Sequence, residues 1–288
     1  MAPAVEGFWG SPTSTLDWCE ANYAVSDYIA EFWNTISNLA MILPPIYGIY
    51  EVLRQKFELR FAICFVLLLV VGLGSWAFHM TLLYEMQLSD ELPMVFCSCF
   101  LLYCLAGIHG IQQNQHINWL SVGFFVYSAL FSLSYLYYPN PLFHQVNYGV
   151  ASVAITLLDI KLLRTQKDRT VRHLFYLGVM LYALAFALWN LDNHGCQSLV
   201  RLRSTLPPVL RPFTQLHAWW HIFAGYATYI HILYCVKARY NILQEKSHIT
   251  LGAMGFTVRR LPTHETNGHT NGHINGRTDN CNNHKHLD

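Results

Sequence analysis

Long apolar segments dominate this chain, and their length constrains its fold more than any other feature. A helix of about 20 mainly apolar residues spans the hydrocarbon core of a bilayer. Of the 288 residues, 12% are charged, which is about half of the share that soluble domains carry. The sequence therefore predicts an all-α membrane protein built as a bundle of seven transmembrane helices. The expected helices cover about 31–51, 61–80, 92–112, 118–137, 142–163, 173–191 and 214–236.

The lysine and arginine residues are unevenly divided between the two ends of these segments. Fifteen of them lie in the connections 52–60 and 161–172 or after the seventh segment, and the other three lie between the sixth and seventh segments. Because basic residues collect on the cytosolic side, we expect a lumenal N-terminus and a cytosolic C-terminus. The first thirty residues do not read as a signal peptide, so the first membrane segment would itself direct insertion.

This orientation divides the chain into three regions. A lumenal segment (1–30) precedes a membrane domain (31–240), which contains the candidates for catalysis, and a cytosolic tail (241–288) follows it. From about residue 262 the tail is rich in Asn, Gly and His, a composition that buries too little apolar surface to fold. We expect disorder there, with weak metal binding by its histidines as the alternative to a solvated linker. The sequence has no clustered basic face, so no nucleic-acid partner is expected.

The eight cysteines fall into three environments. Five lie in membrane segments, and one lies in the cytosolic tail, where thiols stay reduced. The remaining two, Cys19 and Cys196, both lie in predicted lumenal stretches, where the compartment is oxidising. The predicted topology therefore favours a disulfide between them. The other six are Cys64, Cys97, Cys99, Cys104, Cys235 and Cys281.

Three histidines at one predicted depth are the strongest candidates for chemistry. His217 and His221 are four residues apart at the start of the seventh segment, so both imidazoles lie on one helix face. His79 ends the second segment, which runs the opposite way and therefore ends on the same side of the membrane. Three imidazoles with one open position describe a catalytic zinc site. Hydrogen-bonded core histidines, or a haem ligand with a chance neighbour, are the alternatives. Histidines without a same-face partner at matching depth, expected to be structural or interfacial, are His109, His116, His144 and His231.

Two further polar residues accompany these histidines. Ser75 lies one turn before His79 on the same face, where its hydroxyl would point at the metal or bond a carbonyl of its own helix. Asp90 lies on the same side of the membrane, just before the third segment, where it would accept a proton from a zinc-activated water. Its alternative role is a helix N-cap, because Asp followed by Glu-Leu-Pro is typical of a helix start.

A second polar cluster lies in the N-terminal segment. Its alternating oxygen side chains suit a hard cation such as calcium, although the spacing is not that of an EF-hand. Ser14 with Asp17 also fits a helix capping box, and the spacing alone favours that interpretation. The cluster consists of Asp17, Trp18, Glu20, Asn22 and Glu31.

From about residue 8 to 240 the chain resembles the alkaline ceramidase family, most closely its type-3, phytoceramidase-like branch. The similarity is carried by long segments in the same order, among them TSTLDWCEANY, VVGLGSWAFHMTLLYEMQLSDELPM, FALWNLDN and QLHAWWHI. A wider superfamily that includes adiponectin-type receptors shares only the pattern of one Ser, one Asp and three His. The stretch 240–260 and the Asn/Gly/His tail depart from the family pattern.

The resemblance implies particular roles for these residues. The zinc ligands would be His79, His217 and His221, and Ser75 and Asp90 match the family's other catalytic positions. The calcium ligands would be Asp17, Trp18 through its carbonyl, Glu20, Asn22 and Glu31, against the capping interpretation. Cys19 and Cys196 match the family's lumenal disulfide.

The activity that the resemblance implies is hydrolysis of ceramide to sphingosine and a free fatty acid in endoplasmic reticulum and Golgi membranes. We expect a ceramide with a long-chain, unsaturated acyl group as substrate. The alternative is a seven-helix lipid receptor of the adiponectin type with a structural zinc. Such receptors have the opposite orientation and usually a long cytosolic N-terminal region, whereas here the first thirty residues carry no Lys or Arg. A bis-histidine haem protein is a third interpretation, which an absent Soret band would dismiss.

Overall fold

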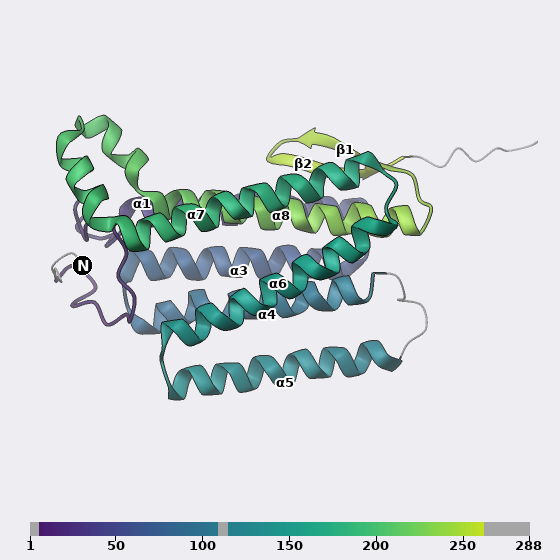
Figure 1. Cartoon of the computed structure of the whole chain (residues 1–288), viewed down its shortest axis with the longest axis horizontal. Helices are drawn as coiled ribbons and strands as arrows, with labels where there is room; N and C mark the ends of the chain where they lie inside the picture. Colours follow the sequence, from purple (N-terminus) through teal and green to yellow (C-terminus); the bar gives the residue numbers. More distant parts are fainter. Residues whose placement is uncertain (1–5, 109–114, 262–288) are drawn as a thin grey trace, which may run out of the picture.

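Long helices that lie side by side make up most of the structure (Figure 1). The computed structural model describes residues 6–108 and 115–261. Successive long helices run in opposite directions along the bundle, as the predicted membrane segments require. The helices are α1 (Phe32–Ser37), α2 (Leu39–Arg54), α3 (Leu59–Thr81), α4 (Tyr84–Ala106), α5 (Gln115–Tyr137), α6 (Pro141–Thr165), α7 (Arg169–Thr205) and α8 (Leu216–Ile242), with a short 3-10 helix η1 (Pro208–Thr214) before α8.

Among the described residues, six helical stretches are long and apolar enough to cross a membrane, namely α1 together with α2, and each of α3 to α7. The structure thus bears out a helical membrane bundle with six candidate spans. The seventh predicted segment corresponds to α8, which has 27 residues but is less apolar because histidines, tyrosines and tryptophans interrupt it. This helix packs against α2, α3 and α7, and most of its second half is buried.

The first predicted segment is broken near its start. α1 and α2 are separated at Asn38, whose side-chain amide donates to the carbonyl of Asn34. Side-chain bonds of this local kind compete with the backbone hydrogen bonds of a helix. Pro44 and Pro45 are tolerated inside α2, although each lacks the amide proton that would bond the preceding turn.

The largest extensions beyond the predicted ends are in α4 and α7. α4 begins before residue 92 because Gln87 and Glu91 in its first turns are buried and hydrogen-bonded, so polar character there does not mark a loop. α7 continues past residue 191 because its polar extension packs against the N-terminal segment, where Asp192 and Arg203 both bond the main chain of Cys19. Buried polar contacts thus lengthen helices that hydropathy alone would end.

The expectation of an entirely helical fold is wrong for one segment of the predicted tail, which precedes the stretch expected to be disordered. Strands β1 (Ser247–Gly252) and β2 (Gly255–Arg260) pair in an antiparallel hairpin that contacts α2 and α8. Each strand has two adjacent β-branched residues at its centre, and two glycines flank the two-residue turn, a pattern typical of hairpins. Thr257 and Val258 are buried against the helices. The tail expected to be disordered, from about 262, lies outside the described residues.

Glycines bring α3 into backbone contact with two neighbouring helices. A Cβ atom at Gly72 would lie 2.8 Å from the carbonyl oxygen of Met41 in α2, a carbonyl left without its helical partner by Pro45. A Cβ atom at Gly74 would lie 1.9 Å from the carbonyl oxygen of Ser89 in α4. Small residues permit this close approach in membrane bundles. At Gly72 and Gly74, α3 is therefore packed tightly against α2 and α4.

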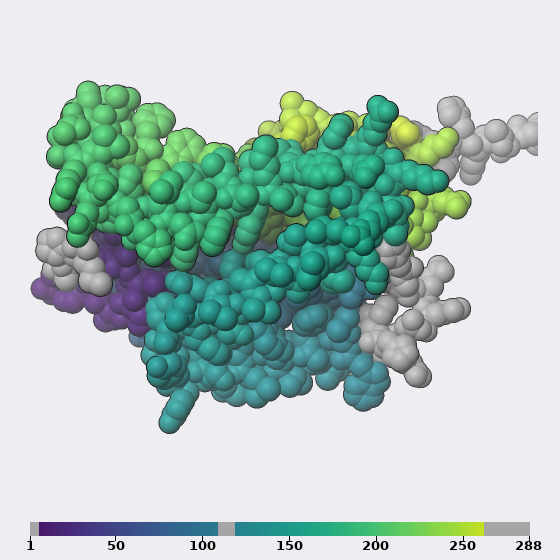
Figure 2. All heavy atoms as spheres, viewed as in Figure 1, coloured from purple at the N-terminus to yellow at the C-terminus, as the bar shows by residue number. Residues whose placement is uncertain are grey.

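The outward faces of α5, α6 and α7 are apolar. These helices cover much of the visible side of the molecule in Figure 2. Few residues in their apolar stretches are buried inside the structure. A soluble protein rarely exposes an apolar surface of this extent, whereas lipid chains would solvate it. Large exposed side chains on this surface include Phe125, Leu133, Val150, Leu157, Met180 and Phe186.

Candidate metal centre

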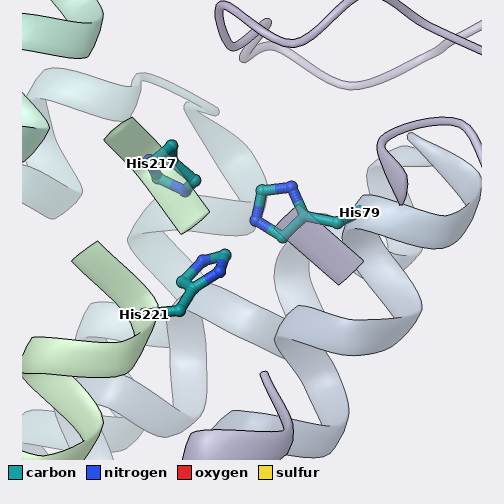
Figure 3. A group of neighbouring side chains, drawn as sticks. All are labelled: His79, His217 and His221. Carbon is teal, nitrogen blue, oxygen red and sulfur yellow. The ribbon is translucent and has the colours of Figure 1, made fainter. Parts of the chain in front are cut away.

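Three imidazoles point toward one another (Figure 3), at the end of α3 and the start of α8. His79 lies in the last turn of α3, and His217 and His221 lie in the first two turns of α8. Their ligand nitrogens lie within 4.8 Å of one another, and all three side chains are buried. The ring centroids are 4.6 to 5.1 Å apart. The structure thus brings together the three histidines that their spacing placed at one depth.

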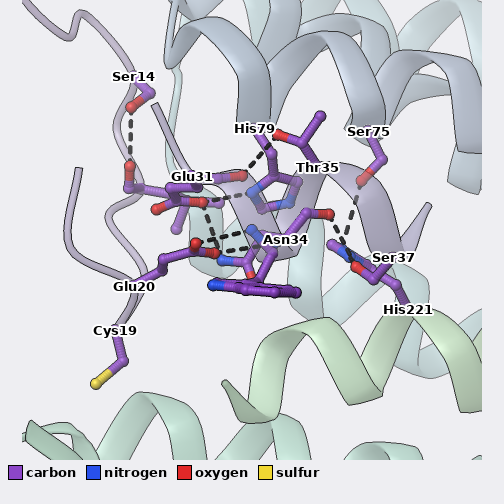
Figure 4. A network of polar contacts seen from close by, with 12 residues as sticks. Ser14, Cys19, Glu20, Glu31, Asn34, Thr35, Ser37, Ser75, His79 and His221 are labelled. Carbon is purple, nitrogen blue, oxygen red and sulfur yellow. Dashed lines mark hydrogen bonds and ion pairs between the residues drawn. The ribbon is translucent and has the colours of Figure 1, made fainter. Parts of the chain in front are cut away.

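Hydrogen bonds orient two of the three rings (Figure 4). His79 Nδ1 lies 2.5 Å from Glu31 Oε2, and His221 Nδ1 lies 2.8 Å from Ser37 Oγ. With Nδ1 engaged in both rings, Nε2 remains available to a ligand. Metal-binding histidines are commonly held in this way by a carboxylate or another polar group on the second nitrogen.

The third ring is held by stacking and by the start of its helix. The indole of Trp18 stacks on His217 with ring centroids 3.7 Å apart. Among the described residues, Nδ1 of His217 has no hydrogen-bond partner. The carboxylate of Asp192 accepts the main-chain N–H groups of Leu216 and His217, which satisfies donors that a helix start leaves unpaired. Sequence reasoning missed Asp192, although a carboxylate directly after an apolar stretch was the available signal.

Ser75 lies between the histidines and Asp90. Its Oγ is 3.5 Å from Nε2 of His221, and its hydroxyl donates to the carboxylate of Asp90. Ser75 is buried, whereas Asp90 is partly exposed. The serine, the aspartate and the histidines singled out by the sequence therefore form one continuous polar group.

The alternative roles of these two residues do not match the structure. Asp90 lies in the second turn of α4, whose N-cap is Leu83, so Asp90 is not a helix cap. The hydroxyl of Ser75 faces the side chains of Asp90 and His221 rather than a carbonyl of its own helix. Both side chains are thus directed into the candidate centre.

The acidic cluster of the N-terminal segment lies beside the histidines (Figure 4). The two carboxylate oxygens of Glu20 accept the N–H groups of Trp33 and Asn34 at 2.8 Å each, at the start of α1. Glu31 accepts a hydrogen bond from the amide of Asn34 and contacts His79. Glu31 therefore links the cluster directly to the candidate centre, a contact that the sequence did not predict.

Negative charge in this cluster is crowded and poorly solvated. Burial, together with the neighbouring charge of Glu31, raises the pKa of Glu20 to about 8, and burial raises the pKa of Asp17. Within the described part of the chain, Glu31 Oε1 and Asn22 Oδ1 are buried without a hydrogen-bond partner. A cation bound by these oxygens would relieve both the repulsion and the missing hydrogen bonds.

The capping-box interpretation of Ser14 and Asp17 is wrong. No helix begins at either residue. The hydroxyl of Ser14 instead donates to the carbonyl of Leu16 at 2.8 Å. Asp17 is therefore free of a capping role.

Cys19 and Cys196 are joined in the structure, and the link ties the N-terminal segment to α7. The main-chain N–H of Cys19 donates to Asp192 at 3.2 Å, and the guanidinium of Arg203 donates to the carbonyl of Cys19. The charge of Arg203 also interacts with Glu20 and Asp192. Sequence reasoning did not single out Arg203. Together these contacts brace the N-terminal segment against α7 beside the histidines.

Two of the histidines expected to be structural have buried partners. His144 Nδ1 lies 3.6 Å from a carboxylate oxygen of Glu91. His231 contacts Asp159 on α6 and Cys235 on its own helix, so the expectation that it has no partner at its depth is wrong. A search for histidine pairs misses carboxylate and thiol partners. Outside the described residues and side chains are His109 and His116.

The donor set of the three-histidine group suits a metal ion. Three buried imidazoles, two of them with Nδ1 fixed, are the ligands that zinc takes in catalytic centres with an open fourth position. The unpaired Nδ1 of His217 is consistent with a ring that completes its contacts through a ligand. Copper and iron also accept imidazole, so the residues fit a transition metal, with zinc the simplest choice.

The fold and the site define a polytopic helical protein with a buried three-histidine centre at one end of its bundle. Residues 10–263 match the family model described as Ceramidase. The match spans both the helices and the candidate centre. The chain therefore belongs to the ceramidase family.

Similar proteins come from animals, fungi and plants. Alkaline ceramidase 3 of Mus musculus is 46% identical over 242 residues, which cover 83% of this chain and 90% of that protein. Alkaline ceramidase YPC1 of Saccharomyces cerevisiae is 37% identical over 246 residues, covering 80% and 78%. Alkaline ceramidase of Arabidopsis thaliana is 32% identical over 229 residues, covering 80% and 85%. The resemblance to alkaline ceramidases, and to their type-3 branch, is thus confirmed.

Proposed function

We propose that this chain is a zinc-dependent intramembrane amidase that hydrolyses ceramide to sphingosine and a free fatty acid. The convergence of the three buried histidines beside Ser75 and Asp90, in a chain of the ceramidase family, carries the proposal. The relatives are named alkaline ceramidases, which points to the amide bond of ceramide as the bond that is cleaved.

The residues of the centre divide the chemistry among them. His79, His217 and His221 would hold the zinc ion, which supplies Lewis acidity and a water that ionises near neutral pH. Asp90 takes a proton from the attacking water and delivers it to the amine as the carbon–nitrogen bond breaks. Ser75 donates a hydrogen bond to the oxygen that gains negative charge at the acyl carbon. The water's hydroxyl thus ends in the fatty acid and its proton on sphingosine.

The substrate would be hydrolysed without leaving the membrane. The outer faces of α5 to α7 are apolar and the histidines are buried within the bundle, so both hydrocarbon chains stay in apolar surroundings. The family resemblance favours a long-chain, unsaturated acyl group.

The topology that fits this role has seven spans, with α8 as the seventh. α8 is long enough at 27 residues, and its burial against α2, α3 and α7 explains why it is less apolar than a lipid-facing helix. The division of Lys and Arg supports a lumenal N-terminal segment and a cytosolic C-terminal region. With this orientation the centre lies at the lumenal end of the bundle, in endoplasmic reticulum and Golgi membranes.

Calcium and the Cys19–Cys196 disulfide would stabilise the lumenal mouth of this centre. Two of the proposed calcium ligands, Glu20 and Glu31, lie at the start of α1. Among the described residues, two buried oxygens of the proposed set, Glu31 Oε1 and Asn22 Oδ1, lack protein partners. Glu31 joins this cluster to His79. The calcium ligands are Asp17, Trp18 through its carbonyl, Glu20, Asn22 and Glu31.

The first test is sphingosine release from a long-chain unsaturated ceramide by the purified full-length protein in detergent. His217→Ala is the control, because it removes one proposed zinc ligand. We expect release that this variant lacks and that a zinc chelator abolishes. No release from a folded, zinc-loaded protein would refute the amidase and favour a lipid receptor. A strong Soret band would instead indicate a haem protein.

A further inference from the structure

A second group of potential metal ligands lies farther along the bundle. It consists of Asp159 on α6 with His231 and Cys235 on α8, and their ligand atoms lie within 4.8 Å of one another. His231 lies ten positions after His221, which corresponds to about 15 Å along α8. This group is therefore separate from the three-histidine centre, and the proposed amidase chemistry does not use it.

The three side chains converge on a single ring nitrogen. Nε2 of His231 lies 2.9 Å from Oδ2 of Asp159 and 3.8 Å from Sγ of Cys235. A proton relay of cysteine, histidine and aspartate would instead use the two opposite ring nitrogens. A shared metal ion would need the carboxylate oxygen, the ring nitrogen and the sulfur to surround one point. Tetrahedral zinc with ordinary bond lengths would place nitrogen and sulfur about 3.5 Å apart and nitrogen and oxygen about 3.3 Å apart. The observed nitrogen–sulfur separation of 3.8 Å is close to this, whereas the 2.9 Å contact with Asp159 would have to lengthen when the ion binds.

A divalent cation at this position would balance the buried negative charge, as would a protonated His231. Asp159 and Cys235 are buried, and the side chain of His231 is 16% exposed. A lone carboxylate is costly to bury in a membrane bundle. One Zn²⁺ with a carboxylate, a thiolate and a neutral imidazole gives a site of zero net charge. Thiolate and imidazole ligands together also favour zinc over calcium or magnesium.

Neighbouring contacts hold the ligands in place. The hydroxyl of Tyr234 donates to the main-chain carbonyl of Asp159 at 3.0 Å, and the ring of Tyr234 stacks on His231 with centroids 5.9 Å apart. His231 and Cys235 are four residues apart, so they share one face of α8. α6 otherwise packs mainly on α4, so a shared ion would tie α6 to α8.

We propose that Asp159, His231 and Cys235 form a second metal site, a thiolate-containing structural zinc site that clamps α6 to α8. The competing interpretation is a metal-free ion pair between Asp159 and a protonated His231, with Cys235 as a neighbouring thiol. The two interpretations differ in the presence of a metal–sulfur bond.

Cobalt substitution tests for that bond without relying on activity. Co²⁺ is added to the metal-free full-length protein carrying Cys281→Ser, which removes the thiol of the histidine-containing tail. A thiolate–cobalt charge-transfer band in the near ultraviolet reports sulfur ligation, and the three-histidine centre supplies no sulfur. We expect the band in this protein, its loss in Cys235→Ser, and its retention in His217→Ala. Cys97→Ser is the matched control, because Cys97 is a buried cysteine outside the group.

Zinc content gives a second, independent result. We expect two zinc ions per chain in the wild type and one in either Cys235→Ser or His217→Ala. Should the cysteine variant fail to fold, the zinc X-ray absorption spectrum of the wild type still decides, since it should show sulfur at about 2.3 Å. A spectrum with nitrogen and oxygen neighbours alone, or a cobalt–thiolate band that persists in Cys235→Ser, would overturn the proposal. A wild-type protein that shows the metal–sulfur bond but releases no sphingosine would refute the proposed function and leave the second metal site supported.

Discussion

The hydroxyl of Ser75 connects the two halves of the candidate centre, since it lies 3.5 Å from His221 and donates to Asp90. Its hydrogen can bond Asp90 or a developing oxyanion, but not both at once. We infer that Asp90 accepts this hydrogen bond in the resting protein and releases it when substrate is bound.

Replacing Ser75 with alanine should lower turnover about 100-fold or more, because loss of one oxyanion donor costs about 3 kcal/mol. Sphingosine release at saturating ceramide measures the effect, and zinc content and melting temperature should stay at wild-type values. Ser98→Ala is a matched control, since that buried hydroxyl donates to the carbonyl of Met94 within α4. Wild-type turnover in Ser75→Ala would exclude the oxyanion role.

Asp90→Asn should abolish hydrolysis while zinc remains bound. The amide has the size of the carboxylate and accepts a hydrogen bond from Ser75, but it does not take up the proton of the attacking water. Zinc analysis and sphingosine release on the same preparation separate proton transfer from metal binding. If this variant hydrolyses ceramide normally, Asp90 has no part in proton transfer.

The residues that the sequence singled out are those whose helix face and depth in the membrane follow from their position within one apolar segment. His217 and His221 share a helix face whatever surrounds them, and antiparallel segments place His79 at their level. Asp192 and Arg203 escaped notice because their role depends on where the N-terminal segment folds back. The sequence does not specify that long-range contact.

At the scale of elements, the contact between α3 and α4 sets the geometry of the centre. Gly74 and Ser89 meet backbone to backbone, one residue before Ser75 and Asp90 respectively. Any separation of the two helices at this level would draw the serine and the aspartate apart.

Gly74→Ala should therefore reduce both activity and stability. Its Cβ would lie 1.9 Å from the carbonyl oxygen of Ser89, so the helices must move apart, and overpacking of this kind costs roughly 1–3 kcal/mol. We expect at least a tenfold loss of sphingosine release and a lower melting temperature. Gly123→Ala on α5 is the control, since a Cβ there meets nothing within 4 Å. Equal behaviour of the two variants would contradict the backbone contact.

The connection between α6 and α7 predicts a pH dependence of stability. Partial burial would raise the pKa of Asp168, but the hydrogen bond and charge of Lys237 lower it to about 2. The unfolded pKa is near 3.9, so the pair stabilises the fold above about pH 4, and this contribution is lost as the pH falls towards 2.

Asp168→Asn should cost about 1 kcal/mol at neutral pH, and the difference from wild type should shrink below pH 4. Asparagine still accepts the N–H of Thr170 at the start of α7, so the variant removes the ion pair rather than the cap. Asp168→Ala removes both and should be less stable than Asp168→Asn. Melting temperatures of the three proteins from pH 3 to 7 measure this, and a constant difference across that range would contradict the assignment.

Apolar length located the membrane helices but not their ends. Gln87 and Glu91 belong to α4 because their partners lie on other elements, which hydropathy does not register. The hairpin at 247–260 has the strand residues and turn glycines of an ordinary β-hairpin. It was missed because a polar stretch after the last membrane helix was read as a tail.

At the scale of the whole molecule, the N-terminal segment closes one end of the bundle. The N–H groups of Ala30 and Glu31 donate to the carbonyls of Met80 and His79, just where α3 ends. The link from Cys19 to α7 fixes the other side of the segment. The N-terminal segment is thus tied to α3, which carries His79, and to α7, which carries Asp192.

Calcium should therefore stabilise the entire bundle rather than the N-terminal segment alone. A ligand bound to the folded state alone adds about 2.7 kcal/mol at a hundred times its dissociation constant, so the melting temperature should rise by several degrees as calcium is titrated. Glu31→Gly removes a proposed ligand and the partner of His79, and it should lower both activity and melting temperature and abolish the response to calcium. Magnesium, which keeps its waters and demands a tighter octahedral site, is the control cation. A wild-type melting temperature that does not change with calcium would contradict the site, because binding to the folded state must raise it.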